Sequence, residues 1–340
     1  MKKIIKTLLF LFIVILIIGL TVGIPYYKRN YSPNVNQEAY IYIPTNATYE
    51  QVRVLIALYV EDMESFDKAA EDQQYPEKIK AGRYKIKKGE NNKEVIRRLV
   101  LGRQDEIHLR IKNYDDIYEL ASDLGKNLES DSLTFIKYFK EAASQKGYSD
   151  VEELKIYFTP ETYYLNWNTS PEDLFSRFEK IHTKFWNEER KSKAEKLHLT
   201  ISEVYTLASI VQKEYVKKDE LPVIASLYLN RLHKEMKLQS DPTVVYAEKK
   251  IQGFKVKRVR IKNVSVDSPY NTYKYKGLPP LPICIPDDFV IEAVLNPSQT
   301  NYLFMCAVRN TGRHVFTADA KEHMKNARDY RDWLDSQGIR

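Results

Sequence analysis

Hydrophobic positions follow three successive patterns along this chain. Residues 7–24 form one uncharged, almost wholly apolar run. Residues 38–112 mix short alternating segments, which are typical of strands, with segments of three-to-four spacing, which are typical of helices. Residues 113–340 begin with amphipathic helical patterns and continue with helices, loops and two short strands. The patterns predict an α+β protein with an N-terminal transmembrane helix, a small α+β module and a larger mixed α/β domain.

The apolar run has the length of a membrane anchor, because about 18 to 20 such residues cross the hydrocarbon of a bilayer as a helix. Pro25, Tyr26 and Tyr27 follow the run, without the small residues of a signal-peptide cleavage site. Lysines before the run favour a cytoplasmic N-terminus, although two basic residues also follow it. We therefore expect residues 1–29 to be a cytoplasmic N-terminus and single-pass anchor, residues 30–37 a linker, and the rest extracytoplasmic.

Residues 38–112 predict a compact module. Strands are expected at 40–43, 82–88 and 107–111, and helices from Thr48 and from about Asn92, the second ending at Gly102. The stretch AGRYKIKKGENNKEVIRRLVLG, residues 81–102, resembles a LysM-like module. This resemblance implies binding to polymers of N-acetyl sugars. A spacer domain without a ligand is the alternative.

Residues 113–340 divide into a helical lead-in at 113–198 and a motif-dense core at 199–325. The lead-in is interrupted at IYFTPETYY, residues 156–164, where we expect an ordered loop or the wall of a cleft. The core predicts a helix at 222–232, a turn at QSDPT (239–243), substrate-facing loops at 268–273 and 277–286, strands at 302–308 and 312–316, and a terminal helix from about residue 320.

Residues 200–215 predict the central helix of the larger domain. Thr200 and Glu203 have the spacing of a capping box, which marks a helix start. At about 100° per residue, the apolar residues one and two turns earlier share the azimuth of Glu214. A carboxyl group among apolar neighbours has a raised pKa and can act as a general acid. A boundary glutamate paired with a lysine is the alternative that the helix pattern alone favours.

Composition narrows the classes of partner. The 340 residues are 43% hydrophobic and 29% charged, with a formal net charge of +7. Lysine and arginine are spread along the whole chain among 46 acidic residues, so we do not expect nucleic-acid binding. The positive excess suits a protein beside anionic lipid or an anionic wall polymer. Cys284 and Cys306 match no zinc spacing and form either a disulfide or two buried thiols.

Eight motifs occur in the order seen in one family. They are LASIVQKE, LNRL, LQSDPTVVY, SPYNTY, GLPPLPI, NYLFMCA, GRHVF and KEH, between Leu207 and His323. The chain therefore resembles the YceG-like family, which contains endolytic murein transglycosylases. The resemblance implies that Glu214, the last residue of LASIVQKE, is the catalytic glutamate. Gln212 stands where the family has an acidic residue, and the loop at 281–287 also departs from the family pattern.

The same resemblance implies a reaction and its setting. The expected reaction is cleavage of the β-1,4 bond between N-acetylmuramic acid and N-acetylglucosamine in nascent peptidoglycan at the inner membrane. It leaves 1,6-anhydro-muramic ends and terminates glycan strand elongation. Glu214 would protonate the leaving oxygen and then accept the proton of the 6-hydroxyl that closes on the anomeric carbon. The implied partners are peptidoglycan glycan strands and peptidoglycan synthases, and no cofactor is expected.

Polar residues in two of the motifs are candidates for binding the sugar. We expect this role for Gln239, Ser240, Asp241, Thr243, Tyr270, Asn271 and Tyr273. Asp241 is alternatively the second carboxylate of a muramidase-type hydrolase, or an aspartate that stabilises a turn. His314 and His323 lack HExxH spacing, so we expect no metal and interpret them as structural or substrate-side residues. A non-catalytic, membrane-anchored peptidoglycan-binding scaffold is the non-enzymatic alternative.

Overall fold

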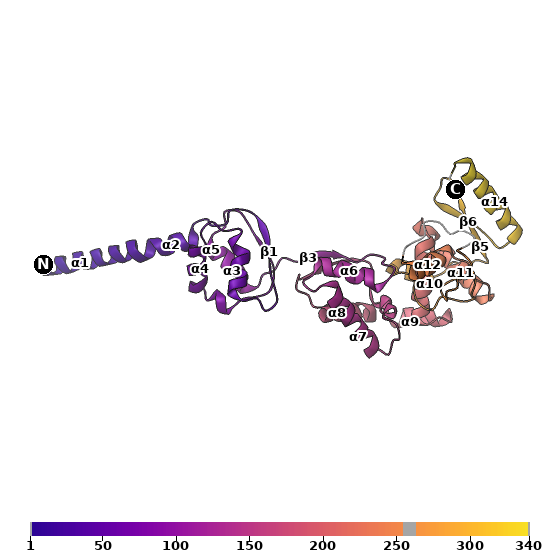
Figure 1. Ribbon diagram of the computed structural model, residues 1–340, viewed down its shortest axis with the longest axis horizontal. Coiled ribbons are helices and arrows are strands. Elements are labelled where there is room, and N and C mark those ends of the chain that lie inside the picture. Colours follow the sequence, from indigo (N-terminus) through magenta and orange to yellow (C-terminus); the bar gives the residue numbers. More distant parts are fainter. Residues whose placement is uncertain (1, 254–262, 339–340) are drawn as a thin grey trace. The chain divides into compact units, whose positions relative to one another are not determined.

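The chain forms two compact units in the computed structural model, which describes residues 2–253 and 263–338 (Figure 1). The first unit comprises Met1–Leu109, Asn127–Ser130 and Tyr163–Ser170. The second comprises Arg110–Lys126, Asp131–Thr162 and Pro171–Arg340. The main segment of the first unit ends close to the expected module boundary at residue 112. Its two later segments have no signal in the hydrophobic pattern.

A long apolar helix begins the first unit. It consists of α1 (Lys2–Ile18), a π-helical segment (Gly19–Gly23) and α2 (Ile24–Tyr31), which follow one another without a break (Figure 1). The stretch Lys3–Tyr31 has the length and composition to cross a membrane, and its most apolar window has a mean hydropathy of 3.0 with none of it buried. The apolar run at 7–24 is thus helical, and the helix continues to Tyr31.

The segment after this helix packs into the first unit. Val35 is 4% exposed and pairs with Val60 through an isolated β-bridge. Asn34 is 6% exposed, and its side-chain amide donates to the Asp62 carbonyl at 2.9 Å. The expectation of a linker at residues 30–37 is therefore corrected. Its polar side chains find partners inside the fold, which low periodicity in the sequence does not reveal.

Two small sheets and three helices complete the first unit. β1 (Ala39–Ile43) pairs antiparallel with β2 (Gly82–Ile86), and β3 (Ile107–Arg110) pairs with β4 (Thr162–Leu165). The helices are α3 (Tyr49–Ala57), α4 (Met63–Asp72) and α5 (Asn92–Leu101), and a 3₁₀ turn covers Tyr75–Glu77. The core is built from the inward residues of β1, β2 and the three helices. The pairing of β3 with β4 explains why residues 163–170 belong to this unit.

Local capping explains where these helices begin and end. The Thr48 hydroxyl accepts from Gln51 N, and the Gln51 side chain accepts from Thr48 N at 2.8 Å. Asn91 and Glu94 form a second capping box at the start of α5, one residue before the expected cap. Gly102 ends α5 with a left-handed φ of 67°. The pattern does not predict α4, because two of its three buried residues are alanines, which give a weak apolar signal.

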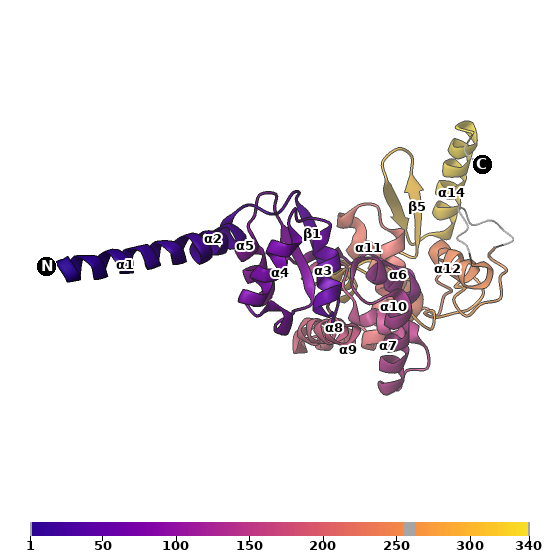
Figure 2. The ribbon, with the colours of Figure 1, turned by 60° about the vertical axis from the view of Figure 1, so that its left-hand side comes forward.

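The described residues of the second unit, up to 253 and from 263 to 338, are mostly helical and include one β-hairpin. Its helices are α6 (Ile117–Asn127), α7 (Ser132–Gln145), α8 (Pro171–Phe185), α9 (Glu188–Lys196), α10 (Ile201–Glu214), α11 (Leu221–His233), α12 (Asp241–Gln252), α13 (Asp288–Leu295) and α14 (Ala320–Ser336), with 3₁₀ segments at Val151–Tyr157 and Lys218–Glu220. β5 (Phe304–Val308) pairs antiparallel with β6 (Arg313–Thr317), and this hairpin packs on α14 (Figure 2). The chain is α+β as predicted, but the expected mixed α/β domain is mostly helical.

Helix α10 is the central helix of the second unit. Thr200 and Glu203 form the expected capping box, with 2.8 Å between Thr200 N and Glu203 Oε2. Every residue from 204 to 211 is buried, and α10 contacts α9, α11, α12 and α13. A helix that is covered on all sides is held in one position. The packing therefore fixes the place of its last residue, Glu214.

The proline-rich loop at 277–286 supports α10. Ile283 N donates to Ser209 Oγ at 2.9 Å, and Asp287 N donates to Gln212 Oε1 at 3.0 Å. The loop was expected to face substrate, but its side chains from 282 to 286 are buried. Gln212, the departure from the family motif, thus has a structural role because its amide oxygen orders this loop.

The QSDPT segment starts a helix instead of forming an isolated turn. Gln239 has a left-handed φ of 52°, Ser240 precedes the helix, and α12 begins at Asp241. Pro242 lies in the first turn, where proline is compatible with a helix because the first N–H groups have no intrahelical partner. The chain reversal before α12 brings Ser240 back toward α10.

Candidate functional site

Glu214, at the end of α10, lies on the wall of a cavity of about 390 Å³. The lining residues come from α10, α11, α12, β5, α14 and the loops between them, and they are Glu214, Leu227, Tyr228, Arg231, Leu238, Gln239, Asp241, Tyr273, Leu303, Phe304, Met305 and His323. Four of the residues predicted from sequence line this cavity: Glu214, Gln239, Asp241 and Tyr273.

Two hydroxyl groups hold one oxygen of the Glu214 carboxyl group. Tyr228 Oη donates to Glu214 Oε1 at 2.9 Å, and Ser240 Oγ donates to the same oxygen at 2.6 Å. Within the described part of the chain, Oε2 receives no hydrogen bond from protein. The two donors are neutral, so they orient the carboxyl group without supplying a compensating positive charge.

The surroundings of Glu214 raise its pKa. Burial is the main cause, because the ionised form loses hydration, and the negative charge of Asp241 acts in the same direction. The hydrogen bonds from Ser240 and Tyr228 oppose this rise, as does nearby His314. The pKa of Tyr228 is itself well above its ordinary value, first because of burial, so its hydroxyl stays protonated and able to donate.

Two threonines position Ser240. Ser240 N donates to Thr272 Oγ1 at 3.0 Å, and Thr243 Oγ1 donates to the Ser240 carbonyl at 2.7 Å. The two threonine hydroxyls lie 2.8 Å apart, and both residues are at most 2% exposed. Thr243 therefore positions Ser240 through a hydrogen bond to its backbone and does not line the cavity.

Asp241 lies on the cavity wall with Tyr273. Tyr273 Oη donates to Asp241 Oδ1 at 2.6 Å. This bond and burial, with burial the larger cause, raise the pKa of Tyr273. The Asp241 side chain is exposed to solvent, and its hydrogen-bond partner Tyr273 is a cavity residue from another motif.

Tyr270 and Asn271 face the interior. Asn271 is fully buried, and its amide donates to the carbonyls of Val264 and Val266 at 2.9 and 2.8 Å. The Tyr270 ring lies 4.8 Å from that of Tyr246, centroid to centroid, on α12. Neither residue lines the cavity, so their expected contact with sugar has no geometric support. Their contacts order the SPYNTY loop that presents Tyr273.

Arg231 and His323 also line the cavity. Arg231 was not predicted as a site residue, and His323 was expected to be structural or on the substrate side. Arg231 Nε donates to the Leu303 carbonyl at 2.7 Å, and Nη1 donates to the Leu238 carbonyl at 2.6 Å. The His323 ring stacks on Phe304 with centroids 5.0 Å apart. Burial lowers the pKa of His323, and the charge of Arg231 adds to this effect. Both lie in quoted motifs, LNRL and KEH, but periodicity gives no sign that the two segments meet.

His314, which is near Glu214, is partnered by Glu220. Its Nδ1 lies 3.0 Å from Glu220 Oε2, and its backbone N donates to Glu220 Oε1 at 2.9 Å. Glu220 is buried at the start of α11. The pair ties β6 to α11, so His314 has the structural role that was one of its two expected roles.

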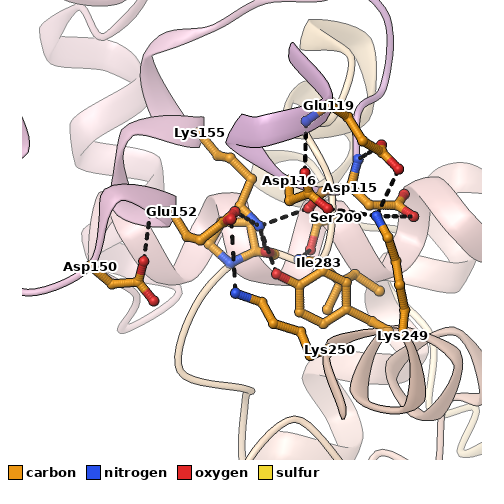
Figure 3. Close-up of polar contacts among 12 residues, drawn as sticks. Asp115, Asp116, Glu119, Asp150, Glu152, Lys155, Ser209, Lys249, Lys250 and Ile283 are labelled. Atoms are coloured by element: carbon orange, nitrogen blue, oxygen red, sulfur yellow. Dashed lines mark hydrogen bonds and ion pairs between the residues drawn. The ribbon is translucent and has the colours of Figure 1, made fainter. Parts of the chain in front are cut away.

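A second, ionic cluster lies behind α10 and is shown in Figure 3. Lys155 is fully buried, and its Nζ lies 3.1 Å from Glu152 Oε2, while Lys250 approaches the other carboxylate oxygen at 3.8 Å. Lys155 Nζ also donates to the Asp115 carbonyl, to Tyr246 Oη and to a carbonyl of the proline-rich loop. Burial lowers the pKa of Lys155, and Glu152 opposes that effect.

Carboxylates from the loop before α6 and from the first turn of α6 complete this cluster. Lys249 Nζ lies 2.6 Å from Asp116 Oδ2 and 2.7 Å from Glu119 Oε1 (Figure 3). Lys213 Nζ lies 2.9 Å from Asp115 Oδ1. Lys213 directly precedes Glu214 in α10. The ion pairs therefore hold α10 and α12 against the segment at residues 115–119, behind the cavity.

Metal-binding groups are not evident around the cavity. Among residues 2–253 and 263–338, no group of three or more histidine, cysteine, aspartate or glutamate side chains could hold a metal ion. Cys284 is buried and Cys306 half-buried, and both are free thiols. The disulfide alternative for these two cysteines is therefore wrong.

Known proteins resemble this chain over most of its length. The family model described as the YceG-like family matches residues 41–329. The endolytic murein transglycosylase of Bacillus subtilis is 38% identical over 207 residues, which cover 59% of this chain and 56% of that protein. The protein of the same name from Streptococcus pneumoniae strain R6 is 26% identical over 283 residues, covering 74% and 51%. The chain thus spans about half the length of these relatives.

A solved structure has the same fold. The crystal structure of a yceG-like protein of Listeria monocytogenes aligns with a TM-score of 0.55 and 23% identity, covering 85% of this chain and 98% of that one. The alignment supports the fold alone, because the sequence identity is low. With the family model matching residues 41–329 and the motifs assembled around Glu214, the chain belongs to the YceG-like family.

Proposed function

We propose that this protein is an endolytic lytic transglycosylase that cleaves the β-1,4 bond between N-acetylmuramic acid and N-acetylglucosamine in nascent peptidoglycan. The names of the relatives support the reaction class. The observation that carries the proposal is the environment of Glu214: a carboxyl group with a raised pKa, in a cavity, held by two neutral donors. This arrangement suits a group that must be an acid in one step and a base in the next.

The two hydroxyl donors determine where the acidic proton resides. An oxygen that accepts two hydrogen bonds behaves as the carbonyl oxygen of a protonated carboxyl group, so the proton of Glu214 is on Oε2. Oε2 gives this proton to the glycosidic oxygen as the bond from that oxygen to the anomeric carbon breaks. The 6-hydroxyl of the muramic acid then closes on the anomeric carbon and returns its proton to Oε2. The product is a 1,6-anhydro end, and no water is consumed.

Asp241 is the group that would support the alternative, a muramidase-type hydrolase. Such an enzyme needs a second carboxylate, at about 5 Å as a nucleophile or about 6.5 to 9.5 Å as a base for water. Asp241 shares the cavity with Glu214, but Tyr273 occupies its Oδ1 with a 2.6 Å hydrogen bond. A carboxylate that is engaged in this way suits the orientation of Tyr273 and of a sugar hydroxyl better than attack on carbon.

The cavity also offers groups that suit an N-acetyl sugar. Phe304 and His323 provide stacked rings, and Gln239 and Tyr273 provide polar atoms that line the same cavity. We infer that Ser240 acts on Glu214 instead of on the sugar, since its hydroxyl is 2.6 Å from Oε1. The predicted substrate role is thus kept for Gln239, Asp241 and Tyr273.

The setting of the reaction is part of the proposal. The helix at Lys3–Tyr31 would anchor the chain in the inner membrane with its N-terminus in the cytoplasm. The enzyme would then meet glycan strands near the peptidoglycan synthases that make them and would end their elongation. The LysM-like module would hold the strand. A membrane-anchored, non-catalytic scaffold for peptidoglycan is the competing function. It would not explain why Glu214 has a raised pKa and borders a cavity.

Mass spectrometry of purified glycan strands after digestion tests the reaction. The transglycosylase yields muramic ends with one water less than hydrolysis products, and Glu214→Gln abolishes them. Ends that carry the full water would overturn the transglycosylase in favour of the muramidase. Intact strands with the parent protein, under conditions in which it binds them, would favour the scaffold.

A further inference from the structure

The end of the apolar helix carries an unusual group of exposed side chains. Tyr26, Tyr27 and Tyr31, in the last two turns of α2, are 43%, 63% and 40% exposed. The rings of Tyr27 and Tyr31 stack with centroids 5.3 Å apart. Lys93, at the start of α5, donates to Tyr31 Oη and lies 4.6 Å from the centre of its ring. We call Tyr26, Tyr27, Lys28, Tyr31 and Lys93 the collar.

The helix that carries the collar is part of the packed unit. α2 contacts both α4 and α5, and Asn30 is 1% exposed between them. The Arg29 carbonyl accepts from Asn92 Nδ2 at 2.8 Å, and the Arg29 guanidinium pairs with Asp72 at 2.5 Å. No flexible segment therefore separates the apolar helix from the fold of the first unit.

The length of the helix gives the collar a definite depth. Residues 7–24 rise roughly 27 Å at 1.5 Å per residue, close to the ~30 Å of bilayer hydrocarbon. The collar residues of α2 follow within about 10 Å, and the adjoining headgroup layer is roughly 5–8 Å deep on each side, so the collar begins inside this layer. Tyrosine is enriched at this depth, because its ring prefers the boundary and its hydroxyl prefers water.

The charges of the collar lack carboxylate partners. Other cations near the helix end are neutralised: Arg29 by Asp72, and Lys68 by Glu64. In the described part of the chain, Lys28 forms no ion pair, and Lys93 is bound to the neutral Tyr31 hydroxyl. Glu61 and Glu64 line a cavity together with Lys28, and their negative charges weaken the attraction of anions to that side of the collar. The attraction is therefore strongest on the side that carries Lys93.

We propose that the collar binds the headgroups of anionic phospholipids and seats the first unit directly on the bilayer surface. The proposal rests on the proposed membrane anchor, and it adds a lipid-binding surface outside the catalytic unit. The phosphate groups would contact Lys28 and Lys93, while the three tyrosine rings lie at the boundary between headgroups and hydrocarbon. The anchor and the first unit then move as one rigid body, and the module cannot swing away from the membrane.

Lysine acylation in nanodiscs tests this surface. The full chain is placed in nanodiscs of phosphatidylcholine, in nanodiscs that also contain phosphatidylglycerol, and in detergent, and the labelling rate of each lysine is measured by mass spectrometry. Lys93 is expected to react about fivefold more slowly in the anionic nanodiscs than in detergent. Lys80 is the matched control, because it is exposed at the other end of α5, where its Nζ contacts the Leu101 carbonyl.

The outcomes separate the parts of the proposal. Equal labelling of Lys93 in all three environments would overturn lipid binding, and elution of the chain apart from the nanodiscs would overturn the anchor as well. The variant Asn92→Ala, which loosens α2 from α5, is expected to restore fast labelling of Lys93 while the chain stays in the nanodisc. Equal slowing of Lys80 and Lys93 would also contradict the proposal, because the protection would then not be confined to the collar. None of these results depends on whether the protein cleaves glycan.

Discussion

Glu214 and Glu152 are two carboxyl groups of the second unit, and their hydrogen-bonding and ionic partners are of opposite kinds. Glu152 is 1% exposed and is paired with the ammonium groups of Lys155 and Lys250 (Figure 3). Glu214 borders a cavity and is held by the hydroxyls of Tyr228 and Ser240. Glu152 thus contacts two full positive charges, whereas the two groups that hold Glu214 are neutral hydroxyls.

The difference shows that this fold keeps a carboxylate that stabilises packing apart from the carboxyl group that borders the cavity. The ionic cluster around Lys155 joins Glu152 to α12, to the segment before α6 and to the proline-rich loop, so its charges stabilise positions. None of the residues of the cluster lines the cavity at the end of α10. Positive charge is thereby used to fix α10 without being placed against Glu214, where it would lower the pKa and oppose the acid role proposed for this residue.

The largest effect is expected when the chemical carboxyl group is removed. Glu214→Gln should lower the cleavage rate by about 10²- to 10⁴-fold, because the amide cannot give or take a proton. The measurement is the release of soluble glycan fragments. Glu195→Gln, an exposed change on α9, is the control and should keep full activity. A Glu214→Gln variant that cleaves as fast as the parent would remove the role proposed for this residue.

Breaking the structural pair should affect stability. Lys155→Met is expected to destabilise the fold by about 3–5 kcal/mol, because Glu152 keeps a buried charge with only the more distant Lys250 beside it. Urea unfolding measures the change. Lys196→Met, at an exposed position on α9, should be neutral.

A double variant checks the cause of that loss. Replacing Lys155 and Glu152 by methionine together should recover part of the stability, because no unpaired charge remains. Recovery is incomplete, since the carbonyl acceptors of Lys155 lose their donor. A single Lys155→Met variant as stable as the parent would mean that the pair does not hold the segments around α10.

Removing one hydroxyl should move the pH dependence of cleavage. Tyr228→Phe deletes a hydrogen bond that stabilises the ionised form of Glu214, so the pKa of Glu214 rises further. Cleavage requires the protonated acid, and the alkaline limb of the pH profile should therefore shift to higher pH, with a reduced maximum rate. Tyr275→Phe, which alters an exposed tyrosine outside the cavity, should leave the limb in place. A shift of the limb to lower pH would contradict the assigned role.

A smaller effect is expected at the other carboxylate of the cavity. Asp241→Asn removes a charge that raises the pKa of Glu214 but keeps an acceptor for Tyr273. The rate should fall by less than about tenfold, equivalent to ~1.4 kcal/mol. Steady-state cleavage of glycan strands measures it. A loss as large as that of Glu214→Gln would indicate that Asp241 takes part in bond breaking and that the hydrolase is correct.

The smallest effect concerns stability at different pH. The pKa of Glu214 in the folded protein is above its unfolded value, so this group costs stability as pH rises from the unfolded toward the folded pKa. Glu214→Gln lacks that cost and should raise the melting temperature relative to the parent more at pH 8 than at pH 4. An equal difference at both pH values would show that the carboxyl group is not perturbed by folding.

The sequence by itself determined the local parts of this protein. The capping box of Thr200 and Glu203 and the capped start of α5 are readable because the partners are three residues apart. The alternation that gives β1 and β2 and the apolar length of the first helix are readable for the same reason. Glu214 was found as the end of an apolar helix, and the quoted motifs identified the family.

Only the tertiary structure decided how Glu214 is held and what surrounds it. Its two donors are 14 and 26 residues away, and Arg231 on α11 and His323 on α14 line the same cavity. Residues 30–37 have a polar, aperiodic sequence, yet Val35 and Asn34 are buried. Such contacts depend on which helices pack together, and packing is set by the summed burial of many distant side chains rather than by the pattern of any one segment.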